Sequence, residues 1–202
     1  MKFQTIGHSE AKRGMEIALT GTHSILLIGP PGCGKGLLSQ DFKNIAELIG
    51  TVFPLPSIAK SRPCPCGFLN DSIRGCRCTT ERQQIFRAEL RLLAESVDMS
   101  ISMQQVPVVL LSEGILRPRS FQERQEDIAT TAERIKTAQG KPRPAEFSDA
   151  AIVAMNNWAS ASAPTARRFH AISAIAITIA QMDGSLLVEQ KHVAEAIRYA
   201  WK

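Results

Sequence analysis

In the first part of the chain, the spacing of apolar residues is typical first of a helix, then of a strand and then of another helix. Residues 9–20 place their apolar side chains on one helical face, so a helix is expected there with Ser9 as its cap. Residues 24–28 form a short apolar run bounded by glycine and proline, which predicts a buried parallel strand. A further helix is expected over residues 37–49, ended by Gly50. The predicted order is therefore helix, strand, glycine-rich loop and helix.

The middle of the chain carries weaker signals. Residues 51–60 are expected to hold a second strand, although the prolines among them cannot donate to a sheet ladder. Thr79 or Thr80 can cap a helix that runs to about residue 95, and residues 97–103 alternate like a strand. The apolar run over residues 106–111 either continues that strand or begins a linker.

The remaining sequence is typical of an all-helical segment. From Phe121 onward Glu, Arg, Gln, Ala and Thr dominate. The glycine and two prolines within residues 140–144 predict the end of a helix there. Three further helices are predicted over residues 148–160, 165–182 and 189–201.

These patterns predict two regions of different character. Residues 1–118 are expected to form an α/β domain with a parallel sheet, flanking helices and a cysteine-rich insert at 62–79, and residues 119–202 an all-helical domain. A chain of 202 residues is long enough for two small domains.

The composition is that of a globular protein, with 44% apolar and 21% charged residues. No stretch approaches the roughly 18 consecutive apolar residues of a membrane helix, and the start lacks the apolar core of a signal peptide. A cytoplasmic protein without a membrane partner is therefore expected. The net charge of +5 comes from scattered Lys and Arg residues, which permits a nucleic-acid partner without supporting one.

A glycine-rich segment after the first predicted strand matches the first seven positions of the phosphate-binding P-loop pattern. Its residues are Gly29, Pro30, Pro31, Gly32, Cys33, Gly34 and Lys35. The glycines allow backbone N–H groups to converge on phosphate oxygens, and the lysine supplies a point charge for the β and γ phosphates. An ATP site is predicted, because a plain glycine turn would not explain a lysine at this spacing. Cys33 is interpreted as a small spacer.

The eighth position of the pattern departs from expectation. A Ser or Thr hydroxyl there ligates Mg²⁺, but this chain has Gly36. Since Mg²⁺ commonly keeps several waters, water can take that coordination position. We therefore expect weakened Mg²⁺ binding, with ATP binding retained better than catalysis.

Four of the five cysteines lie in one short segment as two C-x-C pairs, Cys64 with Cys66 and Cys76 with Cys78. The nine residues between the pairs are enough for the loop to fold back and present four thiolates to one tetrahedral ion. Zinc is the preferred ion, and iron also suits these ligands. The alternative is four reduced thiols in a flexible loop, because this spacing is less specific than paired C-x₂-C.

Four blocks of sequence together resemble the AAA+ family of the magnesium chelatase I subunit and the competence-associated bacterial proteins similar to it. The blocks are residues 6–13 with 16–18, residues 23–35, residues 63–68 with 76–78, and residues 165–170 with 180–184 and 192–196. The resemblance implies a reduced AAA+ sheet followed by a helical lid, with ATP held between them. It also implies assembly with other AAA+ ring subunits.

The resemblance further implies roles for particular residues. Ile6 and Gly7 lie where the family's opening segment borders the adenine, and Arg167 aligns with the lid arginine that contacts the nucleotide. Arg168 is the neighbouring candidate. Apart from the resemblance, an arginine on a helix is more often a solvated charge.

Several hydrolytic groups of the family are missing. Only 28 residues separate Lys35 from Cys64, and no apolar run followed by Asp-Glu, the Walker B carboxylates, occurs among them. Arg62 stands at the position of the family's sensor asparagine and Ser96 at that of its arginine finger. Because phosphoryl transfer depends on positioning and charge stabilisation, autonomous hydrolysis is not expected.

Two structural expectations arise from these gaps. Residues 108–113 imitate a Walker B run with Ser in place of Asp, but their place after the cysteines favours a plain strand end. In the AAA+ strand order 5-1-4-3-2, loss of strands 2 and 3 leaves three adjacent parallel strands and a new exposed edge, which invites pairing with another chain.

Two functions remain open from the sequence. The first is an ATP-binding AAA+ protein, impaired in hydrolysis, that acts as a regulatory or passive subunit. The second is a zinc-stabilised adaptor or nucleic-acid-binding module with a vestigial P-loop.

Overall fold

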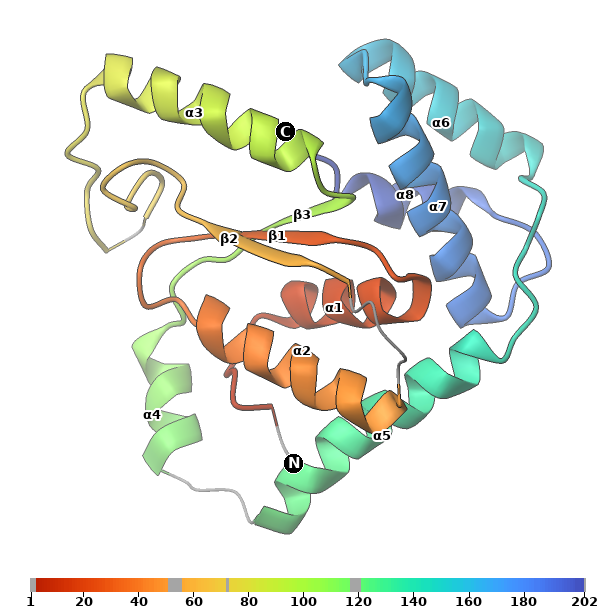
Figure 1. The fold of residues 1–202 in the computed structure, drawn as a ribbon, viewed down its shortest axis with the longest axis horizontal. Coiled ribbons are helices and arrows are strands. Elements are labelled where there is room, and N and C mark those ends of the chain that lie inside the picture. Colours follow the sequence, from red (N-terminus) through yellow and green to blue (C-terminus); the bar gives the residue numbers. More distant parts are fainter. Residues whose placement is uncertain (1–2, 51–55, 72, 117–120, 202) are drawn as a thin grey trace.

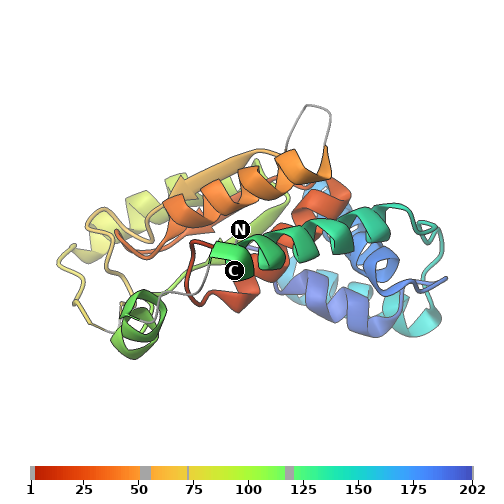
Figure 2. The same ribbon diagram turned by 90° about the horizontal axis from the view of Figure 1, so that it is seen from below.

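A computed structural model describes residues 3–50, 56–71, 73–116 and 121–201, with three strands and eight helices in these ranges. Figures 1 and 2 show a small sheet with helices on both faces and a helical tail beside it. The elements are α1 Ser9–Gly21, β1 Ile25–Ile28, α2 Lys35–Ile49, β2 Ile58–Ser61, α3 Thr80–Glu95, β3 Met99–Ser102, α4 Val108–Leu116, α5 Phe121–Gln139, α6 Asp149–Ser162, α7 Ala166–Asp183 and α8 Gln190–Ile197.

The sheet has the strand order β2-β1-β3, and both pairings are parallel. Every side chain of β1 is buried, because α1 and α2 cover one face of the sheet while α3 covers the other (Figure 1). Leu27 packs into the core with α1 and α2, whereas Leu26 and Ile28 pack with Leu90 and Ala94 of α3. The predicted buried parallel strand and the three-stranded α/β fold with a helical tail are confirmed.

The helix ends agree with the sequence in most places. The Thr79 hydroxyl accepts a hydrogen bond from the Arg82 N–H at the start of α3, and Gly50 follows α2 in the left-handed conformation that favours glycine. Ser9 was wrongly expected to cap α1. It is the first helical residue, and His8 precedes it with a left-handed backbone and no side-chain cap.

Two expectations for the middle of the chain need correction. β2 begins only at Ile58, after Pro56, and residues 51–55 lie outside the described ranges. The apolar run over residues 106–111 is neither a strand nor a linker, because α4 begins at Val108. The last ladder bond of this region runs from the Met103 N–H to the Ile28 carbonyl, and Pro107 then accepts the first helical bond of α4, from the Leu111 N–H. Residues 108–113 therefore form neither the plain strand end that their place favours nor a Walker B strand, because they lie in α4.

The helical tail packs directly on the α/β part. Helix α5 lies along α1 and α2 and also contacts α7, and one cluster of buried residues runs from Met15 through Ile135 to Ile175. The predicted boundary at 118–119 falls among residues outside the described ranges and stays a prediction. None of the described helices is both long and apolar enough to span a membrane.

His23 joins the two parts through a buried hydrogen bond. Its Nε2 lies 2.8 Å from the Thr178 hydroxyl of α7, and the imidazole is 5% exposed. Burial lowers the pKa of His23 from 6.5 to about 4. The folded protein therefore disfavours the protonated ring, whereas the unfolded chain accepts a proton below about pH 6.5.

We expect stability to be fully present above about pH 6.5 and to fall as the pH drops toward 4, by up to roughly 3 kcal/mol from this residue. Urea unfolding at several pH values measures the effect. The variant His23→Gln keeps a hydrogen-bonding side chain but does not titrate, so its stability should vary less over this range. Equal pH slopes for the two proteins would contradict the assignment.

Candidate functional site

The glycine-rich loop joins the carboxyl end of β1 to the first turn of α2, which begins at Lys35. Gly32 and Gly34 have φ values of 80° and 100°, a region that side chains disfavour. At Gly29 a Cβ atom would lie 2.4 Å from the Met103 carbonyl oxygen. The backbone therefore requires glycine at these positions, as a loop that directs N–H groups at phosphate does.

Lys35 holds its ammonium group against the loop. Its Nζ donates to the carbonyl oxygens of Gly29 and Pro30, at 2.7 and 2.8 Å, and lies 3.6 Å from the Cys33 Sγ. A positive charge, the α2 dipole and the glycine backbone thus meet at one point, which is an anion-binding arrangement.

Gly36, which follows Lys35, offers no side-chain ligand for Mg²⁺, but the space around it is open. A Cβ atom added to Gly36 would meet no atom within 4 Å. The fold around this position would therefore accept the Ser or Thr side chain of the usual pattern. The missing hydroxyl reflects the sequence and not a steric limit.

The N-terminal segment is tied to the loop by two residues that the sequence reasoning missed. Asp41 of α2 is fully buried and accepts hydrogen bonds from the N–H groups of Gln4 and Thr5 and from the Thr5 hydroxyl, at 2.9, 3.0 and 2.7 Å. The His8 Nε2 donates to the Cys33 carbonyl at 2.7 Å. Burial lowers the pKa of His8, which favours its neutral form.

These contacts place Ile6 and Gly7 beside the loop, between two anchored neighbours. The signal for Asp41 was available in the sequence, because an acidic residue stands next to the core residue Phe42 and between Leu38 and Ile45. His8 gave no such signal.

Arg167 lies at the amino end of the parallel strands. Its guanidinium donates to the carbonyls of Glu95 and Ser96, at 2.6 and 2.8 Å, just before β3 begins. The loop follows the carboxyl end of the parallel strand β1, whose four residues span about 13 Å at roughly 3.3 Å per residue. The structure therefore brings Arg167 together with Ser96 but not with the loop.

Arg168 is a structural residue in this arrangement. It is 5% exposed and donates to the carbonyl oxygens of Ala94 and, at 3.1 Å, Asp98. Burial lowers its pKa. It satisfies carbonyl groups at the carboxyl end of α3 and so joins α7 to that helix.

The four clustered cysteines converge in space. Their sulfur atoms all lie within 4.8 Å of one another, with Sγ–Sγ distances of 3.4 Å for Cys64–Cys66 and 3.6 Å for both Cys64–Cys76 and Cys66–Cys76. Four thiolates around one zinc ion at Zn–S distances of about 2.3 Å would stand about 3.8 Å apart. The cluster fits a tetrahedral ion of this size.

N–H groups around the cluster donate hydrogen bonds to its sulfur atoms. The Cys66 N–H donates to the Cys78 Sγ at 3.3 Å, and the Gln83 amide donates to the Cys76 Sγ at 3.5 Å. Hydrogen bonds from the N–H groups of Arg77 and Phe68 lower the pKa of Cys66 to about 6. Despite a hydrogen bond from the Cys78 N–H that lowers it, burial and hydrogen bonding with the other cysteines raise the pKa of Cys76 to about 12, and they also raise the pKa of Cys78. Without an ion the cluster therefore favours one thiolate, at Cys66, and a bound ion would displace the protons of the others.

The cysteine segment also touches the glycine-rich loop. Gly67 has a φ of 88°, and a Cβ atom there would lie 2.6 Å from Pro31 Cδ. Any ion that fixes the cysteines therefore also fixes a segment packed on the loop. Arg62, which the resemblance aligns with the sensor asparagine, is exposed and donates to the Pro65 carbonyl at 3.3 Å within the cysteine segment.

Two family comparisons match most of the chain. Residues 2–51 match the family described as magnesium chelatase, subunit ChlI, and residues 113–200 match the family described as the C-terminal part of that subunit. The matches contain the glycine-rich loop and the helical tail. Residues 52–112, which include the cysteine cluster, lie between them.

Two relatives are similar over a shorter segment. The chain is 43% identical over 54 residues to the uncharacterized protein YifB of Salmonella typhimurium and 56% identical over 54 residues to that of Escherichia coli. Each alignment covers 27% of this chain and 11% of the relative. The matched segment is thus a small part of those proteins.

We expect protein purified without oxygen and reconstituted with zinc to hold about one zinc ion per chain. Cys64→Ser and Cys76→Ser should hold far less and melt at a lower temperature, because a structural ion contributes to folding. Cys33→Ser is the matched control and should retain the metal, since Cys33 lies outside the cluster. Elemental analysis with thermal melting measures both quantities, and wild-type protein that stays metal-free would refute the site.

Proposed function

This chain belongs to the magnesium chelatase ChlI family, and on that premise we propose that it binds ATP at the loop Gly29–Gly36 but does not hydrolyse it unaided. The family supports an AAA+ ATPase-like protein with ATP and Mg²⁺ as ligands. The observation that carries the proposal is the position of Lys35, whose ammonium lies within the glycine loop at the start of α2.

Contacts to the phosphates and contacts to the base support the proposed ATP binding. The loop and Lys35 would hold the phosphates, while Ile6 and Gly7, anchored through Asp41 and His8, would border the base. The proposed ligands in the loop are Gly29, Pro30, Pro31, Gly32, Cys33, Gly34, Lys35 and Gly36. With no hydroxyl at Gly36, Mg²⁺ would be held by the nucleotide and water.

The proposed loss of hydrolysis rests on the residues at the strand ends. The residues that directly follow the carboxyl ends of the described strands are Gly29 after β1, Arg62 after β2 and Met103 after β3. None is a carboxylate that could hold Mg²⁺ or orient water. Since phosphoryl transfer requires such groups, binding without turnover is the expected behaviour.

A protein with these properties would serve as a passive or regulatory subunit. The family suggests an oligomeric AAA+ assembly, and a subunit that binds ATP without cleaving it would hold its place between active relatives. Arg167 stays a proposed nucleotide contact. In the isolated chain its partners are the carbonyl groups of Glu95 and Ser96 and, at 3.8 Å, the carboxylate of Asp98.

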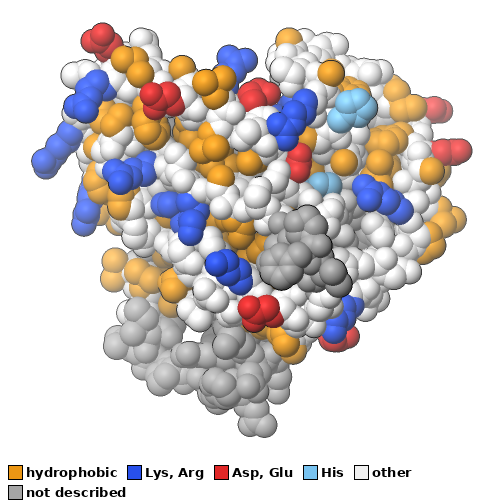
Figure 3. All heavy atoms as spheres, viewed as in Figure 1, with side chains coloured by type: hydrophobic (Ala, Val, Ile, Leu, Met, Phe, Trp, Pro, Cys, Tyr) orange, Lys and Arg blue, Asp and Glu red, His pale blue; other side chains and the backbone are white. Residues whose placement is uncertain are grey.

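The cysteine cluster favours a second candidate, a zinc-stabilised adaptor whose loop no longer binds nucleotide. The face in Figure 3 shows Lys and Arg side chains spread over it, with acidic residues among them. Because such mixing weakens the attraction for phosphate backbones, a protein partner suits this alternative better than nucleic acid.

ATP at one hundred times its dissociation constant should stabilise the folded protein by about 2.7 kcal/mol, which a thermal-shift titration measures. Lys35→Ala should lose most of that shift because it removes the ammonium group. Lys43→Ala, an exposed lysine further along α2, is the matched control and should keep the shift. A shift that is absent, or that persists in Lys35→Ala, sinks the proposal.

Gly36→Thr should restore the Mg²⁺ dependence of binding without restoring turnover. The side chain has room and supplies the missing hydroxyl, so Mg²⁺ should raise ATP affinity several-fold more than in the wild type. ATP titrations with Mg²⁺ or EDTA, together with phosphate release, measure the two effects. Turnover in the variant would show that catalytic carboxylates are present after all.

A further inference from the structure

A cavity of about 340 Å³ lies at the outer edge of β3, where the Ser100 N–H donates to the Tyr199 carbonyl. It is bounded by β1 and β3, by α1 and α3, by the cysteine segment and by the chain after α8. Its volume is at the lower end for pockets that hold small ligands. The glycine-rich loop does not line this cavity.

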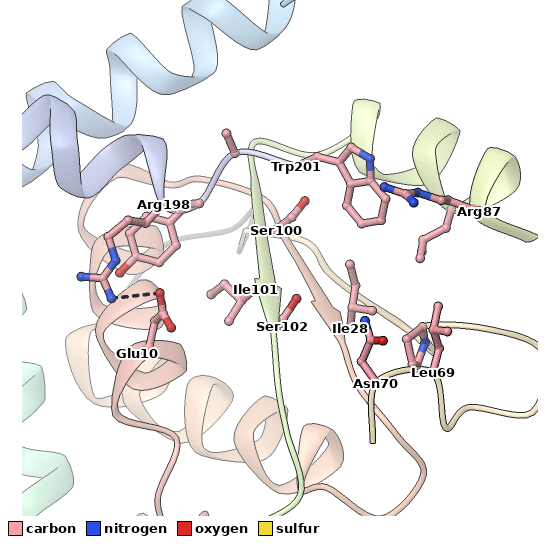
Figure 4. A pocket seen from close by; sticks show the side chains of 14 residues that line it. Glu10, Ile28, Leu69, Asn70, Arg87, Ser100, Ile101, Ser102, Arg198 and Trp201 are labelled. Carbon is pink, nitrogen blue, oxygen red and sulfur yellow. Dashed lines mark hydrogen bonds and ion pairs between the residues drawn. The ribbon is translucent and has the colours of Figure 1, made fainter. Parts of the chain in front are cut away.

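The floor of the cavity carries a buried hydroxyl without a partner. Ser100 is 9% exposed, and its Oγ has no hydrogen-bond partner in the described part of the chain. Figure 4 shows the hydroxyls of Ser100 and Ser102 on the same side of β3, facing Ile28, Asn70, Arg87 and Trp201. A buried polar group of this kind costs free energy unless something in the cavity bonds to it.

The charge at this side of the cavity is positive. Arg87 lines the cavity and forms no ion pair with any described carboxylate. On the other side of β3, Arg198 pairs with Glu10 at 3.0 Å, so those two charges cancel (Figure 4). Because the Arg87 guanidinium has no carboxylate partner among the described residues, it favours an anionic ligand.

One part of the lining is apolar. Trp201 lies beside Arg87, and Ile28, Leu69 and Leu90 also line the cavity, with the polar side chains of Asn70 and Ser102 among them. We propose that this cavity binds a small organic anion with a planar apolar body, such as an aryl carboxylate or sulfonate. Its acid group pairs with Arg87, a polar atom bonds to Ser100, and its ring packs on Trp201.

Fluorescence titration with 8-anilinonaphthalene-1-sulfonate tests this site on the folded, metal-loaded chain. The probe has the proposed chemistry, and N-phenyl-1-naphthylamine is the same molecule without the sulfonate. Arg87→Gln should weaken the sulfonate roughly fivefold, an effect that shrinks at high salt, and should leave the uncharged probe unaffected. Arg91→Gln, one turn further along α3 and outside the cavity, is the matched control.

Ser100→Ala separates a ligand contact from a structural one. Because the hydroxyl bonds to no described group, its removal should leave the melting temperature unchanged or higher, yet weaken the probe roughly fivefold. Equal affinity in wild type, Arg87→Gln and Ser100→Ala overturns the proposal, as does equal weakening by Arg87→Gln and Arg91→Gln. A wild-type protein that binds neither probe while folded also overturns it.

Discussion

The burial of one four-residue strand on both faces is the constraint on which the other features depend. β1 is covered by α1 and α2 on one side and by α3 on the other, and it is paired on both edges. Each of its side chains contributes about 1.5–3 kcal/mol on burial. Its carboxyl end fixes the glycine-rich loop, and its entry at His23 fixes α7 through Thr178. A sheet of three strands is sufficient because its central strand is fully enclosed.

The same sheet explains what a shortened AAA+ protein can keep and what it loses. The loop, its lysine and the N-terminal segment depend on β1 and α2, which are intact. The carboxylates of the family would follow a strand that is absent from the described part of the chain. β2 is now an edge, where the exposed Lys60 discourages pairing with another strand. On the proposed function, the groups that would bind the nucleotide and those that would hydrolyse it belong to different strands of the sheet.

The cysteine cluster links the two chemical features of the chain. Gly67 approaches Pro31 so closely that a side chain would collide, so the cluster forms a wall against the loop. Leu69 and Asn70, between the two cysteine pairs, also line the cavity beside β3. An ion in the cluster would thus order the surroundings of both the nucleotide loop and the cavity, although neither includes a cysteine of the cluster.

The sequence determined the local features of this protein. The run of residues 24–28, the cap at Thr79 and the loop with Lys35 each depend on neighbours a few positions away, and all three are formed as their patterns predict. The C-x-C pairs predicted a cluster because a nine-residue connection restricts where four sulfurs can go.

The tertiary structure decided the rest. The apolar run at Val108 became a helix because β3's ladder had already ended at Met103. The hydrogen-bond partners of Asp41 and Arg167 lie about 35 or more residues away in the sequence. The Ser100 hydroxyl is left without a partner among the described residues, in a cavity that distant segments enclose. No local sequence pattern encodes such contacts.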